Sequence, residues 1–438
     1  MKFSSKLKFL FAGFLVLSSS HTLYANSLKT QQWKTSQGAR VVFYQAQEVP
    51  MLNISIAFAA GSAYDGNQFG LSTLTTNLMN QGSAGMDATK VAENLADTGA
   101  QFVSENSRDM VALSLKTLTN PNAMKKALET FAAIVTKPDF PKEAFEREKN
   151  QQLLSIAQTQ ESPDDVANQL LFKKLYLDHP YAHSINGTKE TVMAMSSTDV
   201  RNFYKRYFVS ANAVIVIVGA VDTVTAHRVA EQITAGLAQG QAAPTIPKAL
   251  PLAAGEKVSV DFPSSQTMLR LSEIGIDHHD PAYFPLTVGN YILGGGALVS
   301  ILSREVREKR GLTYGVTSQF MPMPGNGPFI ISLSTENKEA ATALKVTEDT
   351  LANYLQNGPS EKELADAKQY LMGSFPLSLA SNASIANMLL RIVFYNLPAN
   401  YLDTYVDRIN AVTTAEIKQA FQKQIHPDKM LVIAVGKM

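Results

Sequence analysis

Residues Leu293–Val316 read LGGGALVSILSREVREKRGLTYGV, and this stretch points most directly to the fold of the chain. Three glycines open it, and Leu298, Leu302 and Val306 then recur every four residues, which predicts one face of a helix. Four cations crowd the end of this segment and Gly311 follows them, as is typical of a helix C-terminus. The sequence therefore predicts a helix that ends at Gly311.

The residues after Gly311 predict a strand with one buried face. Residues 312–318 alternate in character, and Tyr314 falls on the same face as Val316. Arg307 lies seven residues before Tyr314, in the last turns of the predicted helix. The pattern thus brings Arg307 and Tyr314 together across a helix-to-strand corner.

The length and composition of the chain indicate a soluble globular protein with more than one core. The chain has 438 residues, of which 45% are hydrophobic and 18% are charged. Residues 1–25 combine three lysines, an apolar run and a Ser-rich end, which predicts a secretory signal peptide that is too short for a membrane span. We expect a periplasmic location and no membrane-spanning segment.

The charge balance argues against nucleic-acid binding. Removal of the signal peptide removes three lysines and no acidic residue, which leaves 36 basic against 38 acidic residues. A net charge near −2 does not suit a polyanionic partner. The chain also has no cysteine, so no disulfide supports the fold.

An internal repeat divides the chain into two halves. Residues Ser196–Gly219 align without gaps with Thr413–Gly436, and Pro141–Leu154 resembles Ser360–Gly373 at nearly the same offset. Residues 235–255 are rich in Ala, Gly, Gln and Pro and predict a linker. We therefore predict an α+β fold with two homologous halves, residues 26–234 and 256–438, each a mostly antiparallel sheet covered by helices, facing each other across a cleft.

The glycines Gly294, Gly295 and Gly296, followed by a Ser, a Leu, and the Arg307/Tyr314 pair, resemble the second half of the pitrilysin/insulinase family of zinc metallopeptidases. Active members carry an inverted zinc motif, H-x-x-E-H, in the first half. The resemblance covers essentially the whole chain after the signal peptide. It implies a two-half peptidase fold with Arg and Tyr donors beside a zinc site.

The resemblance also shows that the zinc motif is degenerate here. Gly70 to Ser83 reads GLSTLTTNLMNQGS, and it places Thr73 and Asn77 at the two histidine positions and Thr76 at the general-base position. A third ligand, a Glu in the family, matches Ser155. Neutral oxygens are poor ligands for zinc in a hydrolase, and a threonine cannot take a proton from water. We predict that the chain binds no zinc and cleaves no peptide on its own.

The remaining histidines do not restore a metal site by their spacing. His278 and His279 are adjacent rather than i, i+4, and Pro180 argues against a helix that would align His179 with His183. Both pairs are interpreted as loop residues. An active peptidase with an unusual metal site is thus a minor alternative.

By resemblance, Arg307 and Tyr314 could support the oxyanion at a zinc site on another chain, as in family members that divide this work between two subunits. The alternative is that Arg307 only complements the helix dipole and Tyr314 is a core residue. The three glycines alone have an equally plain steric explanation. Family members also hold peptides as an added strand, and residues Gln101–Ser107 are the matching stretch, with an ordinary interior strand as the alternative.

The sequence thus predicts the non-catalytic subunit of a periplasmic zinc metallopeptidase. Its expected partners are a homologous subunit with the zinc motif, which alone would hold zinc, and a peptide or unfolded-protein substrate. The rival hypothesis is a non-proteolytic binding or scaffolding protein with a peptidase fold.

Overall fold

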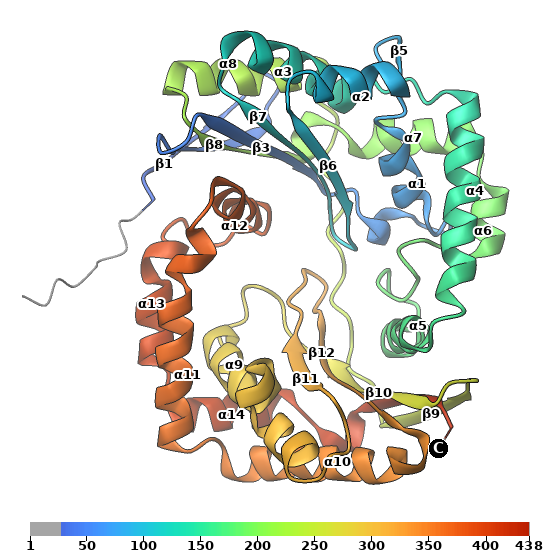
Figure 1. Ribbon diagram of the computed structural model, residues 1–438, viewed down its shortest axis with the longest axis vertical. Helices are drawn as coiled ribbons and strands as arrows, with labels where there is room; N and C mark the ends of the chain where they lie inside the picture. The colour runs from blue at the N-terminus through green and yellow to red at the C-terminus, as the bar shows by residue number, and fades with distance from the viewer. Residues whose placement is uncertain (1–27, 438) are drawn as a thin grey trace, which may run out of the picture.

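The computed structural model describes residues 28–437, so the predicted signal peptide lies outside the described residues. The chain forms two halves, each with one main sheet and its own helices (Figure 1). We call residues 28–234 the N-half and residues 256–437 the C-half.

The N-half sheet has six strands in the order β1-β2-β8-β3-β7-β6, and only the β2–β8 pair is parallel. Its central strand β8 is apolar and buried along its whole length, as expected where both faces of a sheet are covered. The strands are β1 (Thr30–Lys34), β2 (Arg40–Gln45), β3 (Met51–Phe58), β6 (Gln101–Asn106), β7 (Val111–Leu118) and β8 (Ala213–Gly219). A short hairpin, β4 (Gly82–Ser83) with β5 (Met86–Asp87), lies outside this sheet.

The C-half sheet has five strands in the order β11-β12-β10-β13-β9, with one parallel pair, β13–β9. The strands are β9 (Glu256–Asp261), β10 (Gln266–Ile274), β11 (Val316–Phe320), β12 (Pro328–Glu336) and β13 (Leu431–Gly436). Apart from β1, the two sheets therefore have the same strand order and the same placement of the parallel pair.

Helices cover both sheets, and most begin at a capping residue. The N-half helices are α1 (Leu71–Leu78), α2 (Ala88–Ala96), α3 (Pro121–Thr136), α4 (Lys142–Thr159), α5 (Pro163–Tyr176), α6 (Lys189–Ala194), α7 (Ser197–Tyr207) and α8 (Thr223–Thr234). The C-half helices are α9 (Tyr283–Asn290), α10 (Ala340–Asn357), α11 (Glu361–Ser374), α12 (Asn382–Phe394), α13 (Tyr401–Ala411) and α14 (Thr414–Gln424).

The predicted repeat is confirmed residue by residue. Helices α7 and α14 each start with a capping box, from Ser196 in the first and Thr413 in the second, and each leads to a buried strand. The strands end at Gly219 and Gly436, which have φ of +154° and +144°. The predicted fold class, two related α+β halves with mostly antiparallel sheets, is therefore confirmed.

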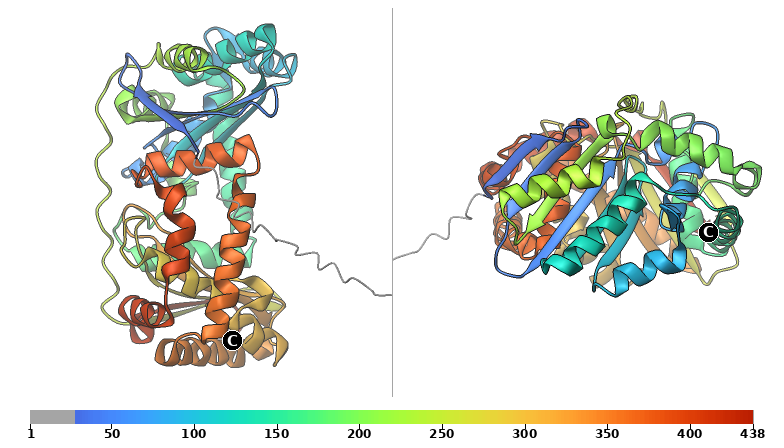
Figure 2. Two further views of the ribbon diagram at one scale, coloured as in Figure 1. Left: turned by 90° about the vertical axis from the view of Figure 1, so that its left-hand side faces the viewer. Right: turned by 90° about the horizontal axis from the view of Figure 1, so that it is seen from above.

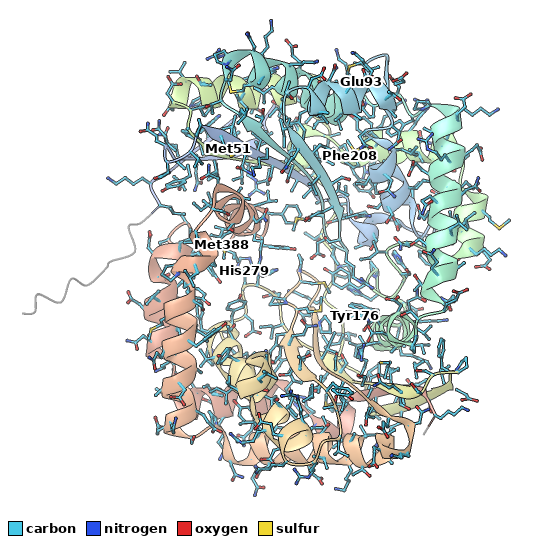
Figure 3. All side chains as sticks on the ribbon, in the orientation of Figure 1. Met51, Glu93, Tyr176, Phe208, His279 and Met388 are labelled. Atoms are coloured by element: carbon cyan, nitrogen blue, oxygen red, sulfur yellow. The ribbon has the colours of Figure 1, made fainter. Side chains whose placement is uncertain are left out.

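One helix of each half packs on the sheet of the other. Helix α5 of the N-half contacts β10 and β13, and α12 of the C-half contacts β3 and β8 (Figure 1). Leu171 of α5 shares a core with Ile433, and Leu389 of α12 shares one with Val216. Figure 3 labels Tyr176 on α5 and Met388 on α12, on opposite sides of the molecule. Neither sheet is therefore fully covered by its own half.

The segment between α8 and β9, residues 235–255, contains no helix or strand. It runs along the outside of the molecule from the N-half to the C-half (Figure 2). Among residues 28–437 no single helix is long and apolar enough to cross a membrane, although α11 with the following turn and α12 together have the length and composition of a span bent by 108°.

Candidate functional site

Thr73, which the resemblance aligns with the first zinc ligand of active family members, is hydrogen-bonded within the chain. Thr73 is only 9% exposed, and its Oγ1 donates to the Ile185 carbonyl (2.8 Å) and accepts from Asn106 Nδ2 (2.9 Å). Thr76, at the general-base position, donates its hydroxyl to the carbonyl of Ser72 one turn earlier (2.8 Å). Both hydroxyls therefore form hydrogen bonds within the chain.

The other two ligand positions carry neutral and unengaged groups. Asn77 is exposed on the same face of α1 as Thr73, and Ser155 is half-buried on α4. Neither side chain has a hydrogen-bond partner within residues 28–437. In the same range no group of three or more His, Cys, Asp or Glu side chains could hold a metal ion. This donor set does not fit zinc, which needs imidazole, thiolate or carboxylate.

Hydrogen bonds from two other elements fix the start of helix α1. Asp65 is 4% exposed and accepts hydrogen bonds from the backbone N–H groups of Gly70 (2.7 Å) and Ser72 (2.8 Å), which fixes the start of α1. Burial raises the pKa of Asp65 to about 8, against the lowering effect of these two donors. Gln152 of α4 also donates to the Gly70 carbonyl (3.0 Å). The N-terminus of α1, which carries Thr73, is therefore held in place by hydrogen bonds.

Three of the four histidines at these loop positions contact backbone carbonyls. His179 Nε2 lies 2.9 Å from the Pro247 carbonyl, and His183 Nδ1 lies 2.9 Å from that of Ser184. His279 Nε2 contacts the Tyr395 carbonyl (2.8 Å), while the ring of His278 stacks on Tyr395. Burial lowers the pKa of His179, His183 and His278, in the last case to about 4.

The stretch that begins with the glycines is the most irregular part of the C-half. It forms a π-helical turn at Tyr291–Gly295, a 3₁₀ turn at Ala297–Val299 and a second π-helical segment at Ser303–Glu308. The expected helix is therefore shorter, and Leu298 is 58% exposed, so the prediction that it shares a buried face with Leu302 is wrong. The reason is that the 3₁₀ turn breaks the 3.6-residue period. Single π turns occur frequently at functional sites.

Tyr314 lies outside the predicted strand and points to solvent. Strand β11 begins only at Val316, and the Tyr314 side chain is 88% exposed, so the expectation of a shared face with Val316 is wrong. Thr313 turns inward instead, because its Oγ1 donates to the Ser334 carbonyl (2.6 Å). Thr335 also donates to the Leu312 carbonyl (2.6 Å). The backbone around Tyr314 is thus fixed, while its ring is free, and the core alternative for this residue is excluded.

Arg307 differs from the other cations around it. The others all form ion pairs: Arg304 with Glu363 (3.1 Å), and both Lys309 and Arg310 with Glu305 (2.7 and 3.1 Å). The half-buried Arg307 guanidinium and the Tyr314 hydroxyl have no hydrogen-bond or ion-pair partner in the part of the chain that the structure describes. Gly311 (φ +64°) ends the segment as predicted, with its N–H bonded to the Arg307 carbonyl (2.8 Å).

The three glycines have a steric role. A Cβ on Gly294 would lie 2.5 Å from the backbone nitrogen of Ser318 in β11, and Cβ atoms on Gly295 and Gly296 would lie 2.8 Å from their nearest neighbours. Gly294 and Gly295 belong to the π-helical turn, so the chain turns away only at Gly296. The next residue, Ala297, has φ of +48°. The glycines therefore allow the helix end to close against β11.

Strand β6 is an edge strand, and its outer side is open. Within residues 28–437 it pairs only with β7, so the interior-strand alternative is wrong. Ser107 N donates to the Met110 carbonyl (2.9 Å), so these two residues form a hydrogen-bonded pair of the β6–β7 ladder. Hydrogen-bonded pairs alternate along an antiparallel ladder, so every second residue of β6 directs its N–H and C=O groups away from β7. These outward residues are Phe102, Ser104 and Asn106. None of these backbone groups has a partner within residues 28–437.

The equivalent edge of the C-half is covered. The Ser318 carbonyl of β11 accepts a hydrogen bond from Asn290 Nδ2 (3.0 Å), and Gly294 packs against the Ser318 backbone. Helices commonly protect sheet edges in this way. Of the two equivalent edges, only that of the N-half is available to another strand.

A polar network between the halves was not anticipated from the sequence. Asp109, at the turn after β6, is 3% exposed and accepts hydrogen bonds from Tyr181 and from Tyr395 of the C-half. It borders a cavity of about 480 Å³ between the two halves, which His278 also lines. Arg307 and Tyr314 do not line this cavity. The sequence offered one signal, the adjacent charges Arg108-Asp109 at a hairpin tip.

Comparison with known proteins gives family matches in both halves of the chain. A family model described as Insulinase (Peptidase family M16) matches residues 40–189, and one described as Peptidase M16 inactive domain matches residues 194–371. The crystal structure of a peptidase M16 inactive domain from Pseudomonas fluorescens is 39% identical, with a TM-score of 0.91, and the match covers 94% of this chain and 99% of that one.

Two curated bacterial relatives are similar over most of their length. A protein of Helicobacter pylori named Non-peptidase homolog YmxG is 25% identical over 408 residues, or 92% of this chain and 93% of the relative. A protein of Bacillus subtilis named Uncharacterized zinc protease YmxG is 25% identical over 355 residues, or 81% and 85% of the two chains. The family resemblance is thus confirmed, and the chain belongs to the insulinase family of peptidases, family M16, as a homologue of its inactive, non-peptidase members.

Proposed function

We propose that this chain is the non-catalytic subunit of a periplasmic zinc metallopeptidase. In this proposal a homologous partner carries the H-x-x-E-H motif and the zinc, and this chain supplies Arg307 and Tyr314 to the partner's site. The periplasmic location rests on the signal-peptide pattern of residues 1–25.

The observation that carries the proposal is the state of these two side chains. Tyr314 is 88% exposed on a backbone fixed by hydrogen bonds. Arg307 has no ion-pair partner among residues 28–437, whereas the three cations beside it are all paired. An exposed phenol and a free guanidinium on a rigid segment are suited to contact another molecule. Both groups are able to donate hydrogen bonds, and neither belongs to a hydrophobic core of the described residues.

Their chemistry suits the transition state of peptide hydrolysis. Zinc on the partner would supply the activated water. The scissile carbonyl oxygen then gains negative charge, and donors fixed in advance stabilise that charge better than mobile water does. The Arg307 guanidinium and the Tyr314 hydroxyl would donate to this oxygen. They need no general base in this chain, which agrees with Thr76 at that position.

The same proposal assigns the open edge of β6 to the substrate. An extended peptide can add to this edge through main-chain hydrogen bonds alone, so its binding does not require the lost metal ligands. Phe102, Ser104 and Asn106 direct their backbone groups to it. The substrate class is therefore a peptide or an unfolded segment of a protein.

The test is to produce the chain together with an H-x-x-E-H homologue from its own host and to measure peptide hydrolysis by the mixed pair. Tyr314→Phe removes one hydroxyl and should lower kcat about a hundredfold, as loss of one oxyanion donor does, without weakening assembly. The matched control is Tyr370→Phe, a tyrosine that is 56% exposed on α11. Equal kcat for both variants, with assembly intact, would favour the scaffolding alternative instead.

A further inference from the structure

Helix α1 lies beside the open edge of β6. The two elements are in contact, as Figure 1 shows, and the Asn106 side chain at the end of β6 donates to Thr73 of α1 (2.9 Å). An added strand would lie about 4.8 Å from β6. A peptide on this edge would therefore run next to the face of α1 that carries Thr73.

Asn77 is the next residue on that face. It follows Thr73 by four residues, and one helical turn advances about 5.4 Å along the axis. Thr73 is buried and engaged on both its donor and its acceptor side, whereas Asn77 is exposed and its carboxamide has no partner among the described residues. Asn77 is thus a free polar group beside the expected path of the peptide.

The carboxamide matches the groups that a bound peptide presents. It has an acceptor oxygen and a donor NH₂ in one plane, and a main-chain peptide unit offers the complementary pair. A strand added to a sheet edge keeps its own far side unpaired. Asn77 can therefore bond to that far side while β6 bonds to the near side.

We propose that Asn77 binds the main chain of an extended peptide paired with β6, so that a position of metal ligation in active relatives has become a position that holds the peptide. This inference rests on the peptide site proposed above. Because both contacts are to the main chain, the ligand is an unfolded segment of little sequence specificity, bound without cleavage by this chain.

The test uses the full mature chain and fluorescein-labelled β-casein, an extended protein, with binding followed by fluorescence anisotropy. Asn77→Ala removes one donor and one acceptor, and we expect Kd to rise about tenfold. Asn77→Gln should restore part of the affinity because it keeps the carboxamide. The matched control is Asn150→Ala, an exposed asparagine of α4 that should leave Kd unchanged.

A second variant separates this inference from the peptide site itself. Ser104→Pro removes an outward N–H of β6 without removing a bond to β7, so it should abolish binding while the chain stays folded. Loss of binding in Ser104→Pro with an unchanged Kd in Asn77→Ala would overturn the role of Asn77 and leave the peptide site standing. No effect of either variant, or no binding by the unmodified chain, would overturn both.

Discussion

The hydroxyl of Tyr395 in the C-half donates a hydrogen bond to the carboxylate of Asp109 in the N-half, with 3.3 Å between the two oxygens. Asp109 lies at the turn that follows β6, so the end of the open edge strand is tied to the other half. Burial raises the pKa of Asp109 to about 6, against the lowering effect of Tyr181 and Tyr395. The ring of His278 stacks on the same Tyr395, and burial lowers its pKa to about 4.

These two groups predict opposite effects of pH on stability. Between about pH 4 and 6 the folded chain keeps the Asp109 proton and the unfolded chain loses it, so this contribution falls as pH rises. His278 is neutral in the folded chain and protonated in the unfolded chain over the same range, so its contribution rises with pH. We expect the two contributions largely to cancel.

Single substitutions should separate the two effects. Relative to the unmodified chain, the unfolding free energy of Asp109→Asn should increase with pH between 4 and 6, and that of His278→Gln should decrease. Urea unfolding at pH 4, 5, 6 and 7 measures both slopes. If the unfolding free energies of all three proteins changed with pH in the same way, the opposite effects assigned to Asp109 and His278 would be refuted.

Helix α5 packs on the C-half sheet and α12 packs on the N-half sheet, so we predict that the two halves unfold together. Leu389 on α12 is 4% exposed and packs against the N-half sheet, so Leu389→Ala should cost about 2–4 kcal/mol. Trp33, the single tryptophan, lies in β1 of the N-half and reports on that half by its fluorescence. The C-half substitution should therefore lower the urea midpoint of the Trp33 signal.

The control for this experiment is Leu377→Ala, which truncates a leucine that is 73% exposed just before α12. It should change the free energy of unfolding by no more than about 0.5 kcal/mol, and so leave the urea midpoint nearly unchanged. A Trp33 transition that is insensitive to Leu389→Ala would mean that the halves are independent.

Tyr314 should contribute little to the stability of the isolated chain. Its hydroxyl has no partner within the described range, so Tyr314→Phe should change the unfolding free energy by less than about 0.5 kcal/mol. Tyr354 provides the contrast, because its buried hydroxyl donates to the Gly289 carbonyl (2.9 Å) and Tyr354→Phe should cost about 1–2 kcal/mol. Thermal unfolding of both variants checks this, and an equal loss in the two would contradict the free state of Tyr314.

Gly294 should tolerate no side chain. Its added Cβ would meet the Ser318 backbone at 2.5 Å, so Gly294→Ala should destabilise the chain by about 2 kcal/mol or more. Gly315 has nothing within 4 Å of an added Cβ, and Gly315→Ala should be nearly neutral. Comparison of the melting temperatures of the two variants tests whether glycine is needed at position 294 because a side chain would not fit there.

Local patterns in the sequence predicted much of this site, and their failures have a physical cause. The caps at Ser196 and Thr413 and the end at Gly311 depend on nearby residues, so they could be identified directly. Leu298 and Tyr314 were placed by assuming an unbroken period. A 3₁₀ turn and an inward Thr313 interrupted that period, and neither has a clear sequence signal.

The amino-acid pattern was enough to predict the two-fold repeat and the spacing of Arg307 from Tyr314. It also showed neutral side chains at Thr73, Asn77 and Ser155, the positions that the resemblance assigns to zinc ligands. Three features became known only from the folded chain. Tyr314 is exposed, and the edge of β6 is open whereas that of β11 is covered. Helices α5 and α12 each pack on the sheet of the other half. The reason is that residue identity and helical spacing are local properties. Exposure and edge pairing depend instead on which distant segments pack together.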